Sequence, residues 1–263
     1  MKKLILFLLI LLWVGSAYPV DYSSDVNCQI AYLFKEGSGT TVDDASQNSN
    51  TGFFKSDGHP AWSSTVPKTY TSYSVDYSSA APDWIGIVDS ASLHSTGNMA
   101  YVSWVNIDAS TSDYQTLFSL RCSNNGAYAI NALVDQTQHP YFAIVHTEGG
   151  AHQHDITDED ALSLDTWYHY AAVWDGTNII IYINGTNVKS ANVGSGTIRD
   201  SAADSYIGIY YNGVTIFYKL EGSLVENGYF DRTLSSTEVN DIMDNGLKPA
   251  AGVTDFSQVI MVF

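Results

Sequence analysis

The sequence predicts an all-β fold, an antiparallel two-sheet β-sandwich (jelly roll) with one short C-terminal helix. Short segments rich in Val, Ile, Tyr, Phe and Trp recur along the chain, and Gly, Asn, Asp and Ser separate them. No window between these segments keeps an apolar period of 3.6 residues, so crossover helices between parallel strands are not expected. The pattern therefore favours antiparallel sheets that pack face to face.

The strand pattern continues through most of the chain. The segment 178–184 contains Ile-Ile-Ile-Tyr-Ile, which is apolar on both faces and typical of a strand whose outer face is also covered. The predicted strands are, in chain order, 29–34, 72–77, 83–88, 99–107, 116–122, 127–134, 141–147, 166–174, 178–184, 205–211 and 216–230.

Two turn sequences predict consecutive hairpins. The segment 175–178, Asp-Gly-Thr-Asn, joins the apolar runs 166–174 and 178–184, and its glycine accepts a positive φ. Asn184 and Gly185 follow, and this pair fits a type I′ turn, which requires positive φ at both central residues. The chain is therefore expected to turn back twice in this region.

The predicted helix lies near the C-terminus. Ser235 is a suitable N-cap, and Glu238, three residues further on, completes a capping box. Val239, Ile242 and Met243 then form an apolar stripe, and a glycine ends the segment at position 246.

The N-terminal residues predict export. Residues 1–17 combine two lysines, a short apolar run and small residues before an expected cleavage site, which is the pattern of a secretory signal peptide and too short for a membrane span. Residues 18–27 are expected to be a linker, and 28–246 the sandwich. Residues 247–263 form a tail whose apolar end is compatible with an additional strand. We expect a secreted or cell-surface protein without membrane insertion.

The composition is strongly acidic. The chain carries 11 Lys and Arg against 28 Asp and Glu, a net charge of −17. Such a surface repels the phosphates of nucleic acids and of anionic membranes, so neither is an expected partner. Neutral glycans, cationic partners and divalent metals remain compatible with this charge.

Cys28 and Cys122 are the only cysteines in the chain. An exported protein can form a disulfide, and a bridge closing a loop of about 94 residues would stabilise the fold by roughly 2–4 kcal/mol. Two buried free thiols are the alternative, and spacing alone does not decide between them.

The order of motifs resembles a known family. Residues 30–52 resemble its opening strand and Asp-rich loop, and 74–106 resemble a strand pair that ends in an aromatic-rich strand. Residues 162–188 resemble its most recognisable hairpin, and 206–243 its last strand and helix. In this order they are similar to the laminin G-like/concanavalin A-like lectin-glucanase jelly-roll domain family. The resemblance covers about 28–246 and implies the sandwich, but the same fold hosts lectins, adhesion modules, glycosidases and lyases.

The resemblance also implies a calcium site. The family often places an acid in its last strand, near the opening Asp-rich loop. Here Val225 occupies that position and Glu226 follows, while Asp44 and Asn48 supply hard oxygens in the loop. Ca²⁺ held by Asp44, Asn48 and Glu226 is therefore one expectation, and a polar loop held by an Asx-turn without metal is the alternative.

Residues 151–160, Ala-His-Gln-His-Asp-Ile-Thr-Asp-Glu-Asp, form the densest group of titratable side chains. His152 and His154 would share one side of a strand, and with His146 or Asp155 they suit a transition metal such as Zn²⁺. A solvated rim is the alternative. The acids lack the Glu-x-Asp-x-x-Glu spacing of the glycosidases on this fold, so we assign no catalytic residue.

Aromatic residues at strand ends and in loops are the candidate ligand contacts. Tyr210, Tyr211 and Asn212 lie where a strand enters a loop, and Trp62 lies in a segment without a clear strand pattern. Such rings stack on sugars while amides bind hydroxyl groups. For each ring, packing in the core is the alternative.

We therefore expect a secreted, non-catalytic binding or adhesion module for carbohydrates or glycosylated surfaces. A polysaccharide-active enzyme, either a glycoside hydrolase or a lyase, is one alternative on the same fold. A structural component of a cell surface or virion is another.

Overall fold

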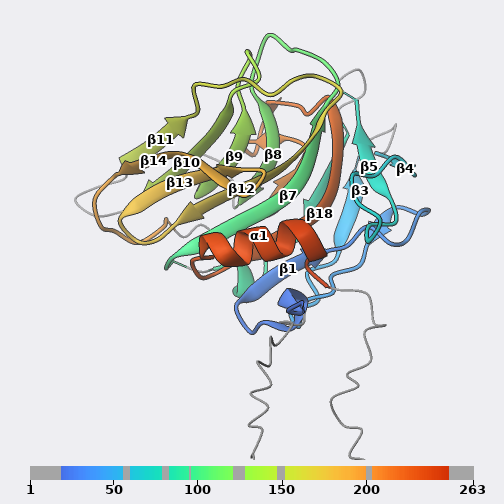
Figure 1. Cartoon of the computed structure of the whole chain (residues 1–263), viewed down its shortest axis with the longest axis horizontal. Coiled ribbons are helices and arrows are strands. Elements are labelled where there is room, and N and C mark those ends of the chain that lie inside the picture. The colour runs from blue at the N-terminus through green and yellow to red at the C-terminus, as the bar shows by residue number, and fades with distance from the viewer. Residues whose placement is uncertain are drawn as a thin grey trace, which may run out of the picture.

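The computed structural model confirms the predicted fold class. It describes residues 19–55, 60–78, 83–94, 96–120, 128–146, 152–199 and 203–248. Within these ranges, two eight-stranded antiparallel sheets, a two-stranded sheet and one α-helix are present (Figure 1). The helix found there is neither long nor apolar enough to cross a bilayer. The expected signal peptide and the tail from residue 249 onward lie outside the described residues.

The first sheet has the strand order β14-β13-β12-β7-β18-β5-β4, and β1 pairs with β18 beside β5. The long strands β7, β12 and β18 form its centre, because β7 pairs with both of the others. Its strands are β1 (Cys28–Tyr32), β4 (Ala61–Ser63), β5 (Ser74–Tyr77), β7 (Met99–Ile107), β12 (Trp167–Trp174), β13 (Asn178–Ile183), β14 (Thr186–Asn192) and β18 (Gly222–Phe230).

The second sheet has the order β11-β10-β9-β8-β15-β6-β3-β2. Its strands are β2 (Thr41–Val42), β3 (Gly52–Lys55), β6 (Trp84–Ile87), β8 (Gln115–Leu120), β9 (Ile130–Val134), β10 (Pro140–His146), β11 (His152–Thr157) and β15 (Ser205–Ile207). The remaining elements are the hairpin of β16 (Tyr210–Tyr211) and β17 (Ile216–Phe217), the helix α1 (Ser236–Asn245), and the 3₁₀ turns η1 (Tyr22–Ser24) and η2 (Ala91–Leu93).

The main core lies between the two large sheets. Tyr101 of β7 packs parallel to Phe118 of β8, with ring centroids 4.9 Å apart. Tyr170 and Trp174 of β12 are fully buried in the same cluster. This inter-sheet core occupies the inner faces, so any ligand site must lie on an outer face or at an edge.

The outer face of the first sheet is covered. Helix α1 places Val239 and Ile242 in a second apolar cluster with Val102 of β7, Val173 of β12 and Phe230 of β18. Figure 1 shows α1 lying across the lower ends of these central strands. The helix therefore covers the lower part of this face.

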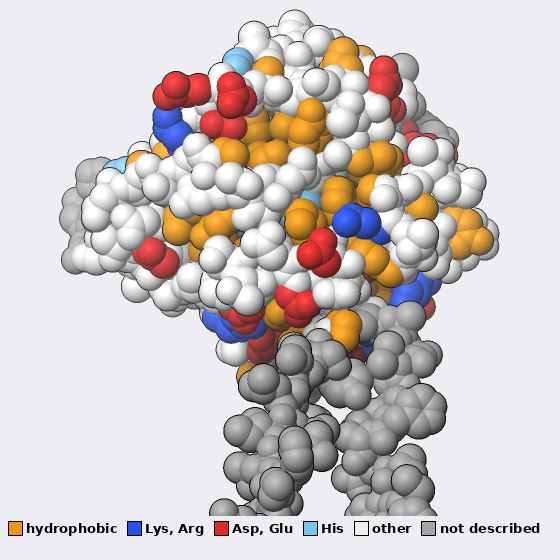
Figure 2. Space-filling view, viewed as in Figure 1, with side chains coloured by type: hydrophobic (Ala, Val, Ile, Leu, Met, Phe, Trp, Pro, Cys, Tyr) orange, Lys and Arg blue, Asp and Glu red, His pale blue; other side chains and the backbone are white. Residues whose placement is uncertain are grey.

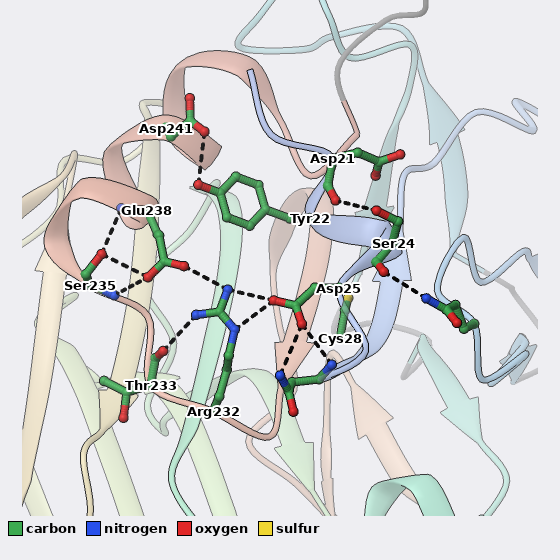
Figure 3. Close-up of polar contacts among 12 residues, drawn as sticks. Asp21, Tyr22, Ser24, Asp25, Cys28, Arg232, Thr233, Ser235, Glu238 and Asp241 are labelled. Carbon is green, nitrogen blue, oxygen red and sulfur yellow. Dashed lines mark hydrogen bonds and ion pairs between the residues drawn. The ribbon is translucent and has the colours of Figure 1, made fainter. Parts of the chain in front are cut away.

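Residues 18–27 do not behave as the expected linker where the structure describes them. Arg232 makes ion pairs with Asp25 at 2.7 Å and with Glu238 of α1 at 2.8 Å (Figure 3). The Tyr22 hydroxyl, on a buried ring, donates to Asp241 at 2.9 Å. Since these contacts join the N-terminal segment to α1, the segment is part of the domain.

The predicted turn and helix signals are confirmed. Asn184 and Gly185 have φ values of 48° and 76°, as a type I′ turn requires. Ser235 and Glu238 form the reciprocal capping box at the start of α1. These local sequence patterns therefore place the β13–β14 hairpin and the helix correctly.

Several strands depart from the prediction. The strands β2, β3, β4, β11 and β14 were not predicted, because the first three are two to four residues long and the last two are largely polar. The predicted strands 205–211 and 216–230 are each divided, into β15 and β16 and into β17 and β18. As a result, β16 and β17 pair with each other in a separate two-stranded hairpin and are not strands of the second sheet.

The surface reflects the acidic composition. On the face shown in Figure 2, Asp and Glu side chains are scattered among neutral ones, with a few Lys and Arg between them. No basic patch is visible among the described residues on this face.

Candidate functional site

The outer face of the second sheet carries polar and aromatic side chains. In β9, Ile130 and Ala132 belong to the inter-sheet core, so Asn131 between them faces outward. The register places Asn131 opposite Ala143 of β10, and Ala143 opposite Asp155 of β11. Side chains from these strands therefore share one surface.

The β16–β17 hairpin packs over this face against β8 and β15. The chain leaves β15 at Gly208, where a φ of 89° turns it out of the sheet. The Asn212 side chain holds the hairpin loop by accepting hydrogen bonds from two backbone N–H groups, at 2.9 and 2.7 Å. After the hairpin, the Thr116 N–H of β8 donates to the Tyr218 carbonyl at 2.8 Å. The hairpin therefore divides the outer face in two.

A groove of about 420 Å³ lies on one side of the hairpin, and we call it the tyrosine groove. Tyr114 contacts both Tyr141 and Tyr218, with each pair of ring centroids 5.2 Å apart. Tyr210 stacks on Tyr218 at 5.5 Å and meets Tyr128 edge-on at 5.7 Å. The groove is lined by Tyr114, Tyr128, Asn131, Leu133, Tyr141, Gln153, Tyr210, Asn212, Phe217 and Tyr218.

A second compartment of about 270 Å³ adjoins the tyrosine groove. Tyr114, Phe217 and Tyr218 line both compartments. The second compartment is lined by Thr111, Ser112, Asp113, Tyr114, Ile216, Phe217, Tyr218 and Lys219. We refer to the two adjoining compartments together as the elongated site.

Asn131 lines the groove with an amide that lacks a protein partner. The residue is fully buried, and neither its side-chain oxygen nor its nitrogen has a hydrogen bond within the described structure. A buried amide without a partner costs roughly 1–3 kcal/mol. Such a group is expected where a ligand or an ordered water completes the hydrogen bonds.

The groove tyrosines keep their protons at neutral pH. Burial, followed by the negative charge of Asp155, raises the pKa of Tyr128 and of Tyr141 well above the ordinary value. Burial also raises the pKa of Tyr114 and of Tyr218. Their hydroxyl groups therefore act as both donors and acceptors toward a ligand.

The structure brings only part of the predicted ligand set together. Tyr210 and Asn212 lie in the tyrosine groove. Tyr211, the next residue after Tyr210, faces a separate groove of about 350 Å³ on the other side of the hairpin, together with Trp84 and Tyr206. Successive residues of a strand point to opposite sides, which explains the separation.

Trp62 lies elsewhere. It belongs to β4 at the edge of the first sheet, and its ring stacks on Phe54 with centroids 5.3 Å apart. It also meets Phe34 and Tyr73 edge-on, and its indole N–H donates to the Gly39 carbonyl at 3.0 Å. These contacts use the ring for packing, so Trp62 does not contribute to the tyrosine groove.

Several groove residues were missed by sequence reasoning. Tyr114, Tyr128 and Tyr141 lie in or beside predicted strands, where a tyrosine is ordinarily assigned to the core. The available signal was Asn131, a polar residue that interrupts the apolar run of 129–134. Because successive side chains of a strand point to opposite faces, Asn131 could have been assigned to the outer face.

The residues of the expected calcium site do not fit a calcium ion. The Asp44 carboxylate already accepts hydrogen bonds from the N–H groups of Ala31, Ser46 and Asn50 and from the Ser46 hydroxyl, at 2.7–2.9 Å. These four donors use the lone pairs that a metal would need. Asn48 donates its amide N–H to the Cys28 carbonyl at 3.0 Å.

Glu226 is the third residue of that expected set. Strand β1 lies between it and Asp44, because Tyr32 pairs with Asn227 on one side and bridges to Asp44 on the other. The described residues contain no group of three or more Asp, Glu, His or Cys side chains placed to hold a metal ion.

The side chains of His146 and His154 lie on the opposite side of the second sheet from the groove. His154 stacks parallel to His146 of β10, with ring centroids 4.5 Å apart. The backbone of His152 pairs with His146, but its side chain lies outside the described part of the structure. The described geometry thus shows a stacked imidazole pair rather than a set of converging metal ligands, and the transition-metal site stays a prediction.

The predicted disulfide falls partly outside the described residues, since Cys122 is not among them. Cys28 is buried and forms no disulfide with another described residue, and its sulfur lies 3.3 Å from the Ile30 carbonyl oxygen. The bridge stays a prediction.

Comparison with known proteins supports the family resemblance. Residues 79–240 match the family model described as the concanavalin A-like lectin/glucanases superfamily. No curated protein matches the chain in sequence.

Solved structures share the fold at low sequence identity. The binding domain of Paraclostridial Mosquitocidal Protein 1 superposes with a TM-score of 0.62 at 13% identity, covering 82% of this chain and 52% of the other. The binding domain of botulinum neurotoxin serotype G gives 0.58 at 14% identity, covering 82% and 50%. That of serotype D gives 0.58 at 12% identity, covering 84% and 52%. The chain thus spans about half the length of these structures, and the likeness shows the sandwich fold.

Proposed function

Since the chain belongs to the concanavalin A-like lectin/glucanase superfamily, we propose that it is a binding module that holds carbohydrate in the tyrosine groove. The observation that carries the proposal is Asn131, a buried amide without a hydrogen-bond partner among the described residues, in a groove walled by tyrosines. Sugars present apolar C–H faces and hydroxyl groups, which aromatic rings and amides recognise respectively.

Three further observations agree with binding rather than catalysis. The described residues that line the first compartment include no acid and no histidine, and those of the second include one acid, Asp113, whereas hydrolysis of a glycosidic bond ordinarily uses two carboxylates. The structural neighbours include the receptor-binding domain of the botulinum neurotoxin C/D mosaic serotype. The expected signal peptide at residues 1–17 agrees with a role outside the cell, and we propose a secreted or cell-surface location.

The first test removes one aromatic wall. Tyr114→Ala is expected to weaken glycan binding by at least about tenfold, because a central aromatic contact ordinarily contributes 2 kcal/mol or more. The measurement is isothermal titration of the wild type and the variant with a neutral oligosaccharide selected from a glycan array. Tyr211→Ala is the matched control, since Tyr211 faces the other groove, and it should bind normally.

An array without any glycan ligand would exclude the carbohydrate proposal. Equal loss of affinity in Tyr114→Ala and Tyr211→Ala would place the site elsewhere. Release of reducing ends or unsaturated sugars from a polysaccharide panel would instead support the enzyme alternative.

The second test separates binding from stability at Asn131. Asn131→Ala removes a buried amide that has no partner, so the variant should be as stable as the wild type or up to about 1 kcal/mol more stable. The same variant should lose roughly tenfold in glycan affinity, because a sugar hydroxyl loses its partner. Thermal unfolding and titration measure the two quantities. A variant that is destabilised but binds normally would give Asn131 a structural role only.

A further inference from the structure

Asp155 is an exposed carboxylate at the rim of the tyrosine groove. It lies on β11 on the same side as Gln153, which lines the groove, because the two residues are two positions apart in the strand. In the register of β10 and β11, Asp155 lies opposite Ala143 and is therefore the diagonal neighbour of Tyr141, another lining residue, on the same face. Besides burial, the negative charge of Asp155 contributes to the raised pKa of Tyr128 and of Tyr141, and together with Asp135 it contributes to that of Tyr114.

No cation balances this charge in the first compartment. Among its described lining residues there is no Lys or Arg. The second compartment contains Lys219, but Asp113 lines the same compartment and offsets it. The elongated site is therefore negative near Asp155 and nearly neutral at its other end.

We propose that the tyrosine groove selects linear oligosaccharides that carry free amino groups, and that Asp155 is the residue that binds the ammonium group. The inference rests on the proposed function and names the class of sugar that the same site takes. The two compartments and the Asn131 amide, which has no partner among the described residues, bind the sugar rings. Asp155 adds the preference for charge, since a carboxylate attracts an ammonium group and repels the carboxylates of uronic acids.

The test compares three hexamers of different charge at low ionic strength and pH 5.5. Glucosamine hexamer is positive, N-acetylglucosamine hexamer is neutral and galacturonate hexamer is negative. We expect the glucosamine hexamer to bind about fivefold more tightly than the acetylated one, the gain of one exposed ion pair, and the galacturonate hexamer to bind weakest. Raising the NaCl concentration should reduce the fivefold preference, because salt screens exposed charges.

Asp155→Asn should bind the positive and neutral hexamers equally. Asp43→Asn is the matched control, since it removes the same charge from an exposed position beside β2, at the opposite edge of the second sheet. It should keep the preference.

The outcomes separate the two proposals. Equal binding of all three hexamers by the wild type, or a preference that survives in Asp155→Asn, would overturn the inference and leave the carbohydrate proposal intact. Absence of binding to any glycan would overturn both.

Discussion

Glu226→Gln is expected to stabilise the protein at pH 8 by up to about 3 kcal/mol, which follows from the large shift in the pKa of this residue. Glu226 lies in β18 at the register shift between Val225 and Asn227, and only 5% of its surface is exposed. Burial raises its pKa from the ordinary value of 4.5 to about 7, although the Leu247 N–H and the charge of Lys35 oppose the shift. At pH 8 the folded protein therefore contains a buried, ionised carboxylate, which lowers its free energy of unfolding.

The direction of the pH effect follows from this shift. Between pH 4.5 and 7 the folded state binds a proton at Glu226 that the unfolded state releases, so the wild type loses stability as the pH rises. Glutamine carries no charge and keeps an oxygen that accepts from the Leu247 N–H, which lies 3.3 Å from the carboxylate. The variant should therefore lack this pH dependence.

Thermal unfolding at a series of pH values measures the effect. For a domain of this size, about 3 kcal/mol corresponds to a rise in Tm of roughly 6–10 °C at pH 8, which should vanish at pH 4.5. Subtracting the wild-type curve from the variant curve removes contributions from other acids. Examples are Asp25, whose pKa is lowered by the Asn27 N–H and by Arg232, and Glu238, whose pKa is lowered by Arg232. If the variant is less stable than the wild type at pH 8, the carboxylate at position 226 stabilises the fold, through Leu247 or through a bound cation.

The architecture was predictable where local chemistry carries the signal. The Asn184-Gly185 turn and the capping box of Ser235 with Glu238 involve neighbours in the chain, and the structure has both. The missed strands depend on partners that are distant in sequence. Strand β11 is an example, because five of its six residues are polar and it exists through pairing with β10 along its whole length. Short or polar strands lack a recognisable pattern of their own.

The candidate site was predictable only in part, for the same reason. Tyr210 and Asn212 stood out because they lie at a strand end, where polar and aromatic residues indicate a loop. Tyr211 carries the same sequence signal but faces the other groove. Tyr114 and Asn131 come from different parts of the chain and meet through the topology of the second sheet. Composition and spacing do not contain that information.

The β16–β17 hairpin depends on Gly208, and Gly208→Ala is expected to cost about 3 kcal/mol of stability. A φ of 89° costs about 1 kcal/mol for a residue with a Cβ. The added Cβ would also lie 2.6 Å from the ring of Tyr77, which is buried in the inter-sheet core, and 3.2 Å from the Asp83 carbonyl oxygen. Crowding of this kind in a packed core costs roughly 2 kcal/mol more.

Comparison with Gly194→Ala separates the cost of crowding from the cost of the backbone conformation. Gly194 has a similar φ of 82°, but nothing lies within 4 Å of the position of an added Cβ, so only the backbone cost of about 1 kcal/mol applies. Chemical denaturation of both variants gives the difference, which we expect to be about 2 kcal/mol. Gly208→Ala should also weaken glycan binding, because Tyr210 and Tyr218 reach the tyrosine groove only if the chain leaves β15 at this angle. Equal costs in the two variants would mean that the Tyr77 ring moves aside, and that the hairpin tolerates displacement at its base.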